Sequence, residues 1–387
     1  MYTLVNFHMF KKILSIILIV FLLYFFLEED KYSLKNIQIA SSMPLTGLMQ
    51  PWGNAVLEST KSYFSYTNDN NLLNGKKIEF VTLDDKYEPD LTYENVEKLK
   101  KENIFAFFGI VGTPTIKRIL PTIYDENILF FSPFSGANFL QDESLSTLIN
   151  FRASYKQELE HLIDYLKNKN IENIAIFYQN DDYGEEGYIS SLEIIKKQNL
   201  NLVAIGSYKR NTLAIEHAFN EIKLSNPEAI ILIGAYGANS FFIQKAKNDD
   251  ILKDSIFCNV SFSDANSIIN DLKTTKTSTE NIIFSQVVPN YDDKNLKIVQ
   301  EYQEIMKKYS PNSNIGFLSF ESFLASKVLV DAIKRTNDNL TKDNFLEALK
   351  NTPKELLYEI KIDYKNKRLL NQTYLFEYLN DSFKELK

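Results

Sequence analysis

The sequence is poor in the residues that bind metals or cross-link a chain. Its 387 residues include one cysteine, three histidines and twelve glycines. A single cysteine excludes an intramolecular disulfide, so the folded domains must be held by their hydrophobic cores. Cys258 ends the apolar run Ile256–Cys258, and we predict that it is buried and unreactive. The histidines (His8, His161 and His217) are scattered and do not have the spacing of zinc ligands.

Patterns of catalytic machinery are also absent. No glycine-rich phosphate loop ends in Lys-Ser or Lys-Thr, and no G-x-S-x-G nucleophile elbow occurs. Two pairs of neighbouring carboxylates, Asp84-Asp85 and Asp181-Asp182, could suggest a metal site or an acid–base pair. Both pairs follow predicted strands in acidic loops, where solvated or capping roles are commoner. The sequence therefore predicts no enzyme, no cofactor and no bound metal.

The charge and composition of the chain narrow the class of partner. Lysine and arginine total 43, aspartate and glutamate total 50, and the net charge is −7. No basic stripe interrupts this balance, which argues against a nucleic-acid binder. Hydrophobic residues make up 44% and charged residues 24%, as in ordinary globular proteins. The length allows two domains, each with its own core.

The N-terminus carries a long apolar run. Lys11-Lys12 precede fifteen uncharged residues, Ile13–Leu27, and Glu28-Glu29-Asp30 end the run. This charge bias places the downstream chain on the far side of the membrane. The run has the length of a signal-peptide apolar region, but no small-x-small cleavage site follows it.

Residues 1–32 are therefore predicted to be an uncleaved signal anchor, a transmembrane segment, with a cleaved signal peptide as the alternative. The chain from about Ser33 onward is expected to lie in the periplasm, or more generally outside the cytoplasm, and to stay anchored to the inner membrane. Translation could begin at Met1 or at Met9.

From Ile37 onward, strand and helix patterns alternate. Several of the predicted strands are continuous apolar runs, which are typical of strands that helices cover on both faces. The predicted strands are Ile37–Ala40, Lys77–Leu83, Ile104–Gly109, Ile128–Ser132, Asn173–Tyr178, Leu202–Ser207, Ala229–Gly234, Ser255–Asn259 and Ile282–Val287. Helical patterns fill the intervals, and a Ser154–Gln157 capping box opens one of them. The alternation predicts an α/β protein with parallel, doubly wound sheets and right-handed crossovers.

These strands are many for one sheet, and the chain can be divided after residue 152 and after residue 288. Two Rossmann-like lobes around a central cleft are the simplest architecture. We assign 33–152 with about 289–350 to lobe 1, and 153–288 with about 351–387 to lobe 2. The later segments are predicted as helices Asn295–Lys308, Phe317–Arg335 and Lys342–Lys350, and as a tail hairpin of Tyr358–Tyr364 with Thr373–Tyr378.

Two predicted strands end in loops of small, hydroxyl-bearing and glycine residues. These loops are Gly109–Pro114 and Ser132–Ala137. In a parallel sheet they lie side by side at the carboxyl edge, where open α/β sheets bind ligands. Thr113 as N-cap, with Pro114 as the first helical residue, adds a helix N-terminus that faces the same place. Ser135 is a second candidate hydroxyl, with a plain turn role as its alternative. The loops predict a site for a carboxylate or another small polar group.

Short motifs follow one another in order and at suitable spacing along the chain. They are Met43–Gly47, Trp52-Gly53, Asn74–Ile78, Asp84-Asp85, Gly109–Thr113, Ser132-Pro133, Phe151-Arg152, Asp182–Gly184, Gly234–Tyr236 and Ser319–Phe323. Together they resemble the Leu/Ile/Val-type periplasmic binding proteins, which serve ABC transporters of branched-chain amino acids. The resemblance covers nearly all of residues 36–380. It implies a two-lobed type I binding-protein fold that closes around a small solute and delivers it to an ABC permease.

The resemblance also implies which residues bind the ligand in lobe 1. Thr113 matches the position whose hydroxyl holds the ligand carboxylate, with simple helix capping as the alternative. Phe134 and Gly136 match positions whose backbone groups line the pocket, and Ser135 lies between them. Trp52 matches an aromatic residue that covers the ligand from this lobe, and core packing is its alternative.

Two aromatic residues of lobe 2 complete the predicted pocket. Tyr183 and Tyr236 match positions that cover the ligand, although they could simply seal the cleft. Amino-acid binders of the family hold the ligand ammonium with an acidic residue of lobe 2, but the equivalent stretch Cys258–Phe262 contains none. Asp264, the nearest acid, is expected to cap or begin the next helix. A buried ammonium without a counter-charge is costly, so a carboxylate or an amide competes with a branched-chain amino acid as the ligand.

The leading interpretation is a membrane-anchored solute-binding protein of an ABC importer. In a second interpretation the same fold, held at the membrane, presents its ligand state to a receptor or a histidine kinase. The uncleaved anchor favours this sensor somewhat, because a binding protein profits from free movement. A third is an activator of cell-wall enzymes that keeps the fold without the pocket.

Overall fold

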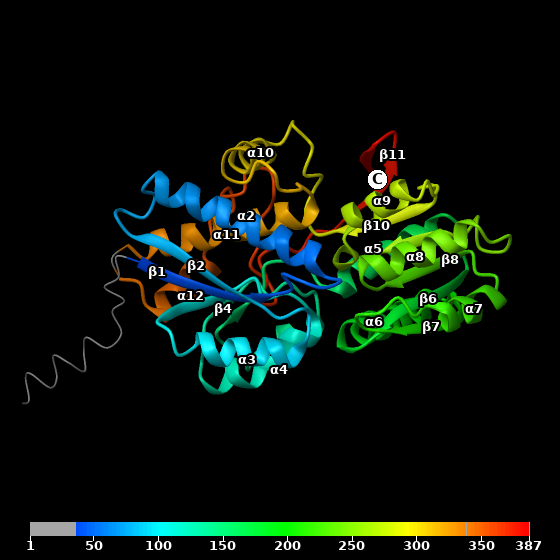
Figure 1. Ribbon diagram of the computed structural model, residues 1–387, viewed down its shortest axis with the longest axis horizontal. Helices are drawn as coiled ribbons and strands as arrows, with labels where there is room; N and C mark the ends of the chain where they lie inside the picture. Colours follow the sequence, from blue (N-terminus) through cyan, green and yellow to red (C-terminus); the bar gives the residue numbers. More distant parts are fainter. Residues whose placement is uncertain (1–35, 338, 387) are drawn as a thin grey trace, which may run out of the picture.

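The strands form two separate sheets, one in each half of the molecule (Figure 1). The computed structural model describes residues 36–337 and 339–386. The first sheet is built from β1 (Asn36–Met43), β2 (Lys77–Asp84), β3 (Ile104–Phe108), β4 (Phe130–Phe131) and β5 (Leu148–Ile149). Its order is β2-β1-β3-β4-β5 and every pairing is parallel. We call this half lobe 1.

The second sheet, in lobe 2, contains the remaining described strands. They are β6 (Asn173–Asn180), β7 (Asn201–Lys209), β8 (Ala229–Ile233), β9 (Ile256–Asn259), β10 (Ile282–Gln286), β11 (Tyr374–Leu379) and β12 (Ser382–Leu386). The order is β12-β11-β10-β9-β8-β6-β7. Strands β6 to β10 pair in parallel, whereas β11 and β12 add an antiparallel edge.

Helices cover both sheets, and three late helices return to lobe 1 (Figure 1). Lobe 1 carries α2 (Gln50–Asp69), α3 (Pro89–Leu99), α4 (Thr113–Asp125), α10 (Lys297–Tyr309), α11 (Phe317–Arg335) and α12 (Lys342–Lys350). Lobe 2 carries α5 (Tyr155–Asn168), α6 (Asp182–Lys197), α7 (Glu216–Leu224), α8 (Tyr236–Lys247) and α9 (Ala265–Thr274). Two short 3-10 helices, η1 (Asn138–Gln141) and η2 (Ser261–Ser263), follow β4 and β9.

Helix α11 is the central helix of lobe 1. It is buried on nearly every side, as expected for a helix that is apolar all round. It packs on α2 through small hydroxyl residues: Ser59 Oγ donates to the carbonyl of Ser319 at 2.5 Å, and Thr60 and Ser322 share a 2.9 Å hydrogen bond. These contacts fix the helix that carries Trp52.

No helix in residues 36–337 or 339–386 is both long enough and apolar enough to cross a membrane. The predicted anchor, residues 1–32, lies outside the described part of the chain.

The chain passes between the two lobes after β5, after β10 and after α12. The third passage runs beside the first: the Asn150 N–H donates to the Lys367 carbonyl at 2.8 Å, and the Leu370 N–H to the Phe151 carbonyl at 2.8 Å. The first and third passages are therefore bonded to each other where they join the lobes. Two parallel-dominated α/β sheets in two lobes confirm the predicted fold class.

The predicted tail hairpin is wrong in its first strand. Residues Tyr358–Tyr364 form no strand, and β11 instead pairs with β10 on one side and β12 on the other. The hairpin turn is Asn380-Asp381, whose φ angles of 49° and 58° are those that a two-residue hairpin turn requires. The sequence pattern alone did not show that the partner of β11 in the hairpin would be β12, which follows it, rather than the segment that precedes it.

Cys258 behaves as its apolar surroundings predict. It is a free cysteine, fully buried on β9. Burial raises the pKa of its thiol to about 12, so the reactive thiolate is suppressed at neutral pH. The predicted burial of Cys258 is confirmed, and the raised pKa is consistent with an unreactive thiol.

Candidate functional site: an aromatic cage between the lobes

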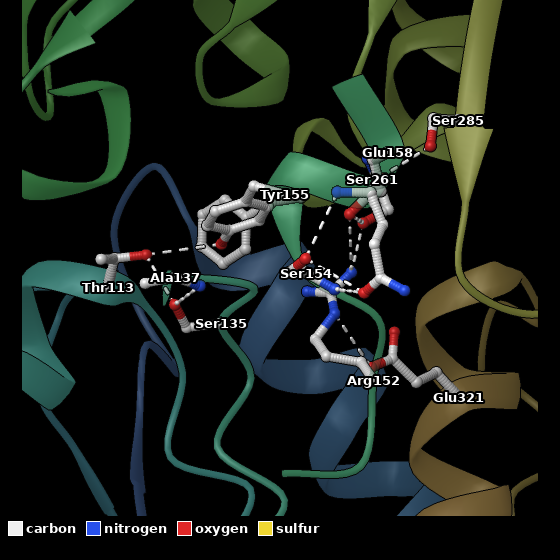
Figure 2. Close-up of polar contacts among 12 residues, drawn as sticks. Thr113, Ser135, Ala137, Arg152, Ser154, Tyr155, Glu158, Ser261, Ser285 and Glu321 are labelled. Carbon is white, nitrogen blue, oxygen red and sulfur yellow. Dashed lines mark hydrogen bonds and ion pairs between the residues drawn. The ribbon is translucent and has the colours of Figure 1, made fainter. Parts of the chain in front are cut away.

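The two predicted strand-end loops meet through their hydroxyl groups. Thr113 Oγ1 lies 2.8 Å from Ser135 Oγ and 3.4 Å from the hydroxyl of Tyr155 (Figure 2). Ser135 Oγ also accepts the Ala137 N–H at 3.2 Å. All three hydroxyl residues are buried. We call Thr113, Ser135 and Tyr155 the hydroxyl cluster.

The capping role predicted for Thr113 is wrong. Gly112 is the N-cap of α4, and Thr113 is already helical. Gly112 has a φ of 105°, which glycine adopts without strain, and a Cβ there would lie 2.3 Å from the ring of Tyr87. Because glycine makes the turn into the helix, the Thr113 hydroxyl is not needed as a cap and lies in the hydroxyl cluster.

Tyr155 reaches the cluster because it is the first residue of α5. Ser154 caps the helix: its Oγ accepts the Gln157 N–H at 3.3 Å, and the Gln157 side chain accepts the Ser154 N–H at 3.0 Å. The predicted capping box is thus confirmed. A Cβ on Gly136 would lie 2.7 Å from the Tyr155 ring, so glycine at this position permits the close approach of loop and ring.

Aromatic rings from both lobes pack beside the hydroxyl cluster. We call them the aromatic cage: Trp52, Tyr87 and Phe134 from lobe 1, and Tyr155, Tyr183 and Phe262 from lobe 2. The ring of Phe262 lies 4.6 Å from that of Trp52 and 4.7 Å from that of Tyr183, centroid to centroid. Tyr87 and Tyr155 complete its surroundings at 6.2 Å and 6.4 Å. The ring of Phe134 packs against that of Trp52, with the two ring centroids 5.3 Å apart.

The cage is also a contact between the lobes. The indole N–H of Trp52, on α2, donates to the carbonyl of Phe262, on η2, at 3.0 Å. Partly exposed ion pairs join the lobes nearby: Lys117 to Asp182 at 2.5 Å, and Arg210 to Glu88 at 2.7 Å. The two lobes therefore meet in this structure, and the cage lies inside their contact.

Two cage tyrosines have hydroxyl groups that make no close hydrogen bond. In the described part of the chain, the buried hydroxyls of Tyr87 and Tyr183 make no hydrogen bond of normal length; Gln179 interacts weakly with the first and Ser263 with the second. Gln179 and Ser263 are the polar side chains beside them, and burial raises the pKa of both tyrosines well above the usual value. Both hydroxyls therefore stay protonated and can donate to an acceptor. A buried hydroxyl without a partner is costly, which makes this place suited to a polar ligand group.

A charged cluster lies next to the cage, on the first crossing between the lobes (Figure 2). Arg152 is buried, with its Nε 3.3 Å from Glu321 of α11 and its Nη2 3.9 Å from Glu158 of α5. Glu158 also accepts the N–H and the hydroxyl of Ser261 at 2.7 Å and 2.8 Å, and the hydroxyl of Ser285 at 2.9 Å. We call Arg152, Glu158 and Glu321 the hinge cluster.

The comparison with known families identifies the protein class. A profile of the family described as "Periplasmic binding protein" matches residues 36–382, most of the chain. The chain belongs to this family. Its members are solute-binding proteins rather than enzymes; they bind small molecules outside the cytoplasm and work with ABC transporter permeases.

Solved structures agree with this assignment. A possible leucine/isoleucine/valine-binding protein from Rhodopirellula baltica SH 1 is 27% identical, with 91% of this chain and 96% of that chain covered and a TM-score of 0.84. A branched-chain amino acid ABC transporter protein from Thermus thermophilus with bound valine is 15% identical (92% and 96% covered, TM-score 0.80). A solute-binding protein from R. palustris in complex with benzoate is 14% identical (91% and 95%, TM-score 0.78). At such identities the last two show the fold alone.

In this periplasmic binding protein, most of the predicted ligand-binding residues lie together. Trp52 and Tyr183 are in the cage, and Thr113 and Ser135 are in the adjoining hydroxyl cluster. Phe134 contributes its ring rather than free backbone groups, because its N–H donates to Ile110 at 2.9 Å and its carbonyl accepts from Gly112 at 3.1 Å.

Two further predicted residues have other surroundings. The carbonyl of Gly136 accepts the Tyr155 N–H at 2.9 Å, which holds the loop against the start of α5. Tyr236 lies apart from the cage and lines a separate pocket between the lobes, with a volume of about 910 Å³. We call this the outer pocket. Its lining includes Glu58, Asp264 and Asp271 but no lysine or arginine.

The acids noted in the sequence have structural roles. Asp264 is the N-cap of α9 and accepts the Ser267 N–H at 3.3 Å, as predicted. Asp181 caps α6, and Asp84 accepts the N–H of Leu45 at 2.9 Å. No group of three or more His, Cys, Asp or Glu residues within 36–337 and 339–386 could hold a metal ion.

Sequence reasoning gave no ligand role to three of the cage rings and to the hinge cluster. Tyr87 and Tyr155 follow or begin elements at the carboxyl edge of a sheet, just as Thr113 does, and this position was a usable signal. Phe262 and Glu321 had no local signal, because they reach the site only through the packing of distant elements.

Proposed function

We propose that this periplasmic binding protein binds a small solute with a carboxylate or amide end at the aromatic cage and delivers it to an ABC permease. The polar end would lie at the hydroxyls of Thr113 and Ser135, beside the first turn of α4. A carboxylate takes charge-assisted hydrogen bonds there and is favoured by the helix dipole. The observation that carries the proposal is the pair of buried hydroxyls on Tyr87 and Tyr183, which make no hydrogen bond of normal length, in a cage that both lobes build.

The chemistry of the cage argues against an α-amino acid as the preferred solute. None of the cage residues is charged. Glu158, the buried acid of α5, already serves Arg152, Ser261 and Ser285. A ligand ammonium would have no free carboxylate to balance it, which is costly in a buried site. Among the solved structures of this fold, one holds valine and another benzoate, so both ligand types are compatible with the architecture.

The lobe boundaries and the membrane attachment belong to the same proposal. Lobe 1 would comprise 33–152 with about 289–350, and lobe 2 would comprise 153–288 with about 351–387. Residues 1–32 would hold the protein at the inner membrane as an uncleaved anchor. N-terminal sequencing of the mature protein tests the anchor: a chain that begins near Glu28 would show cleavage.

A sensor for a receptor or histidine kinase is the second candidate, and the apolar run without a cleavage site favours it. Both functions use the same solute site. The neighbouring genes distinguish them: genes for a permease and an ATPase support transport, whereas a kinase gene supports sensing.

Trp52 provides a direct test of the solute site, because it is the only tryptophan and lies in the cage. Its fluorescence in the full-length protein, purified in detergent, should respond to any solute that enters the cage or moves Phe262. We would titrate benzoate, benzamide, butyrate, leucine and leucinamide, and follow the melting temperature in parallel. Saturable changes with the carboxylates or amides are expected, with leucine weaker. If no solute changes either signal, the cage is not a solute site.

A further inference from the structure

Phe262 holds an unusual position for a residue at the centre of a binding site. Its ring is almost completely buried, at 1% exposure, among the rings of Trp52, Tyr87, Tyr155 and Tyr183. The apolar ring fills the space among the other cage rings. It offers no hydrogen-bond acceptor to the hydroxyls of Tyr87 and Tyr183, which make no close hydrogen bond. The packing of the cage is therefore complete while its hydrogen bonding is not.

The backbone on both sides of Phe262 is firmly held. Ser261 is bonded to Glu158 of the hinge cluster through both its N–H and its hydroxyl. Asp264 has a left-handed conformation, φ 58° and ψ 85°, and caps α9. The Phe262 carbonyl itself accepts the Trp52 indole N–H. These contacts hold the main chain, whereas the side chain of Phe262 is fixed only by ring packing. Departure of the ring would therefore break no hydrogen bond of the Phe262 main chain.

We propose that the ring of Phe262 is an internal occupant of the solute site, and that the solute is an aromatic carboxylate whose ring takes its place. This inference rests on the proposed function of the cage as the solute site. The cage already accommodates one phenyl ring, which indicates the shape of the group that it accepts. A ring that carries a carboxylate restores the packing and also gives the hydroxyls of Thr113, Tyr87 and Tyr183 an acceptor, which Phe262 cannot do.

The internal occupant also explains how selectivity arises without a charged residue in the cage. A solute must repay the displacement of Phe262 with packing of its own, so a small aliphatic acid leaves part of the cage unfilled. An α-amino acid brings an ammonium group for which none of the cage residues offers a carboxylate. The free-energy cost of displacing Phe262 therefore favours flat, ring-sized acids, whose own packing offsets it best.

The test uses Trp52 fluorescence in the full-length protein and its Phe262→Ala variant. Benzoate is the main probe, with benzyl alcohol, butyrate, leucine and glycine betaine as comparisons. Removing the internal ring should tighten benzoate binding at least tenfold and should make benzyl alcohol binding detectable. The Trp52 hydrogen bond goes to the main chain of residue 262, so the variant keeps its reporter contact.

Two further variants keep the test decisive. Phe262→Leu retains bulk without a ring, should also tighten benzoate binding, and serves if the alanine variant does not fold. Phe242→Leu is the matched control: Phe242 is fully buried in lobe 2 against Phe177 and Phe219, away from the cage, and its replacement should leave benzoate affinity unchanged.

The outcomes separate this inference from the proposed function. Equal or weaker benzoate binding in both Phe262 variants, with binding intact in the wild type, overturns the internal occupant and leaves the solute site standing. Preferred binding of glycine betaine overturns the aromatic class, because a cage of rings can also hold a quaternary ammonium. No binding by any probe to any variant overturns the proposed function and this inference together.

Discussion

The aromatic cage and the hinge cluster are both buried where the lobes meet, yet their chemistry is opposite. The cage consists of uncharged rings and hydroxyls contributed by both lobes. The hinge cluster places a fully buried guanidinium, on the chain crossing itself, between carboxylates from α11 and α5 (Figure 2). They are close in sequence as well, since Tyr155 of the cage follows Arg152 by less than one helical turn.

The proposed function gives this difference a reason, because the two regions would move by different amounts when the lobes open. In a hinge rotation, atoms are displaced in proportion to their distance from the axis, so groups on the crossing move least. A buried ion pair is strongly destabilised when one partner is lost, which makes the crossing a suitable place for it. In the proposed function the cage separates when a solute enters, and uncharged rings and hydroxyls can be wetted without leaving a charge unpaired. Four predictions test this division, from the largest expected effect to the smallest.

The largest effect is expected from Arg152→Met. The change leaves Glu158 and Glu321 buried without their positive partner, which should cost about 3–5 kcal/mol of unfolding free energy. Urea denaturation at pH 7.5 measures it. Lys156→Met is the control, because the Lys156 side chain is 40% exposed and pairs with exposed Glu193; its effect should stay within about 0.5 kcal/mol. A loss below 1 kcal/mol for Arg152→Met would show that the hinge charges do not depend on one another.

The second prediction concerns pH. Burial raises the pKa of Glu321 to about 7, from its usual value of 4.5, although the charge of Arg152 works against the shift. Between these values the folded protein keeps a proton that the unfolded chain loses. Stability from this group is therefore greatest below pH 4.5 and falls by about 3 kcal/mol as pH rises to 7.

Glu321→Gln should remove this part of the pH dependence. Asp85, Asp181 and Asp264 have pKa values raised to about 6 by burial, so they contribute a similar fall at slightly lower pH. The comparison is therefore the difference between variant and wild type in urea unfolding at pH 5 and pH 7.5. Parallel curves for the two proteins would mean that Glu321 does not titrate in this range. Exposed Glu193→Gln serves as the control and should match the wild type at both pH values.

Features that depend on local sequence could be predicted, whereas features that depend on contacts between distant segments could not. Alternating apolar strands and amphipathic helices specify a doubly wound α/β chain locally, so the parallel strands were predictable. Strand β5 and the β11–β12 hairpin were not, because two-residue strands and hairpin partners depend on neighbours that are distant in sequence. The two strand-end loops were predictable for the same local reason as the strands that they follow.

The centre of the site was harder to predict than its edge. Trp52, Thr113 and Tyr183 lie at the ends of elements, where position alone suggests a ligand role. Phe262 looked like part of an apolar stretch that lacks an acid, and only the fold shows that its ring fills the cage. Arg152 carried a charge that predicts exposure, but its burial depends on two acids from elements on either side of it.

The third prediction tests the polar end of the solute. Thr113→Val keeps the side-chain shape but removes the hydroxyl that meets Ser135 and Tyr155. Benzoate affinity, followed by Trp52 fluorescence, should fall about tenfold, or about 1.4 kcal/mol. Thr115→Val is the matched control on the same helix turn, since the Thr115 hydroxyl bonds to the Gly112 carbonyl at 2.7 Å and not to the cluster. Equal losses in both variants would point to a general disturbance of α4.

The smallest effect is expected from a comparison of Tyr183 and Tyr236, which the sequence analysis assigned to the same pocket. Tyr183→Phe removes a buried hydroxyl that makes no close hydrogen bond, so the solute-free protein should gain up to about 1 kcal/mol of stability. The same change should weaken benzoate binding several-fold, because the hydroxyl is proposed to donate to the carboxylate. Tyr236→Phe changes a residue of the outer pocket and should alter neither quantity measurably. Thermal unfolding and fluorescence titration of both variants provide the measurement. If Tyr236→Phe weakens binding as much as Tyr183→Phe does, the solute extends into the outer pocket, and its three carboxylates could then hold the ammonium of an amino acid.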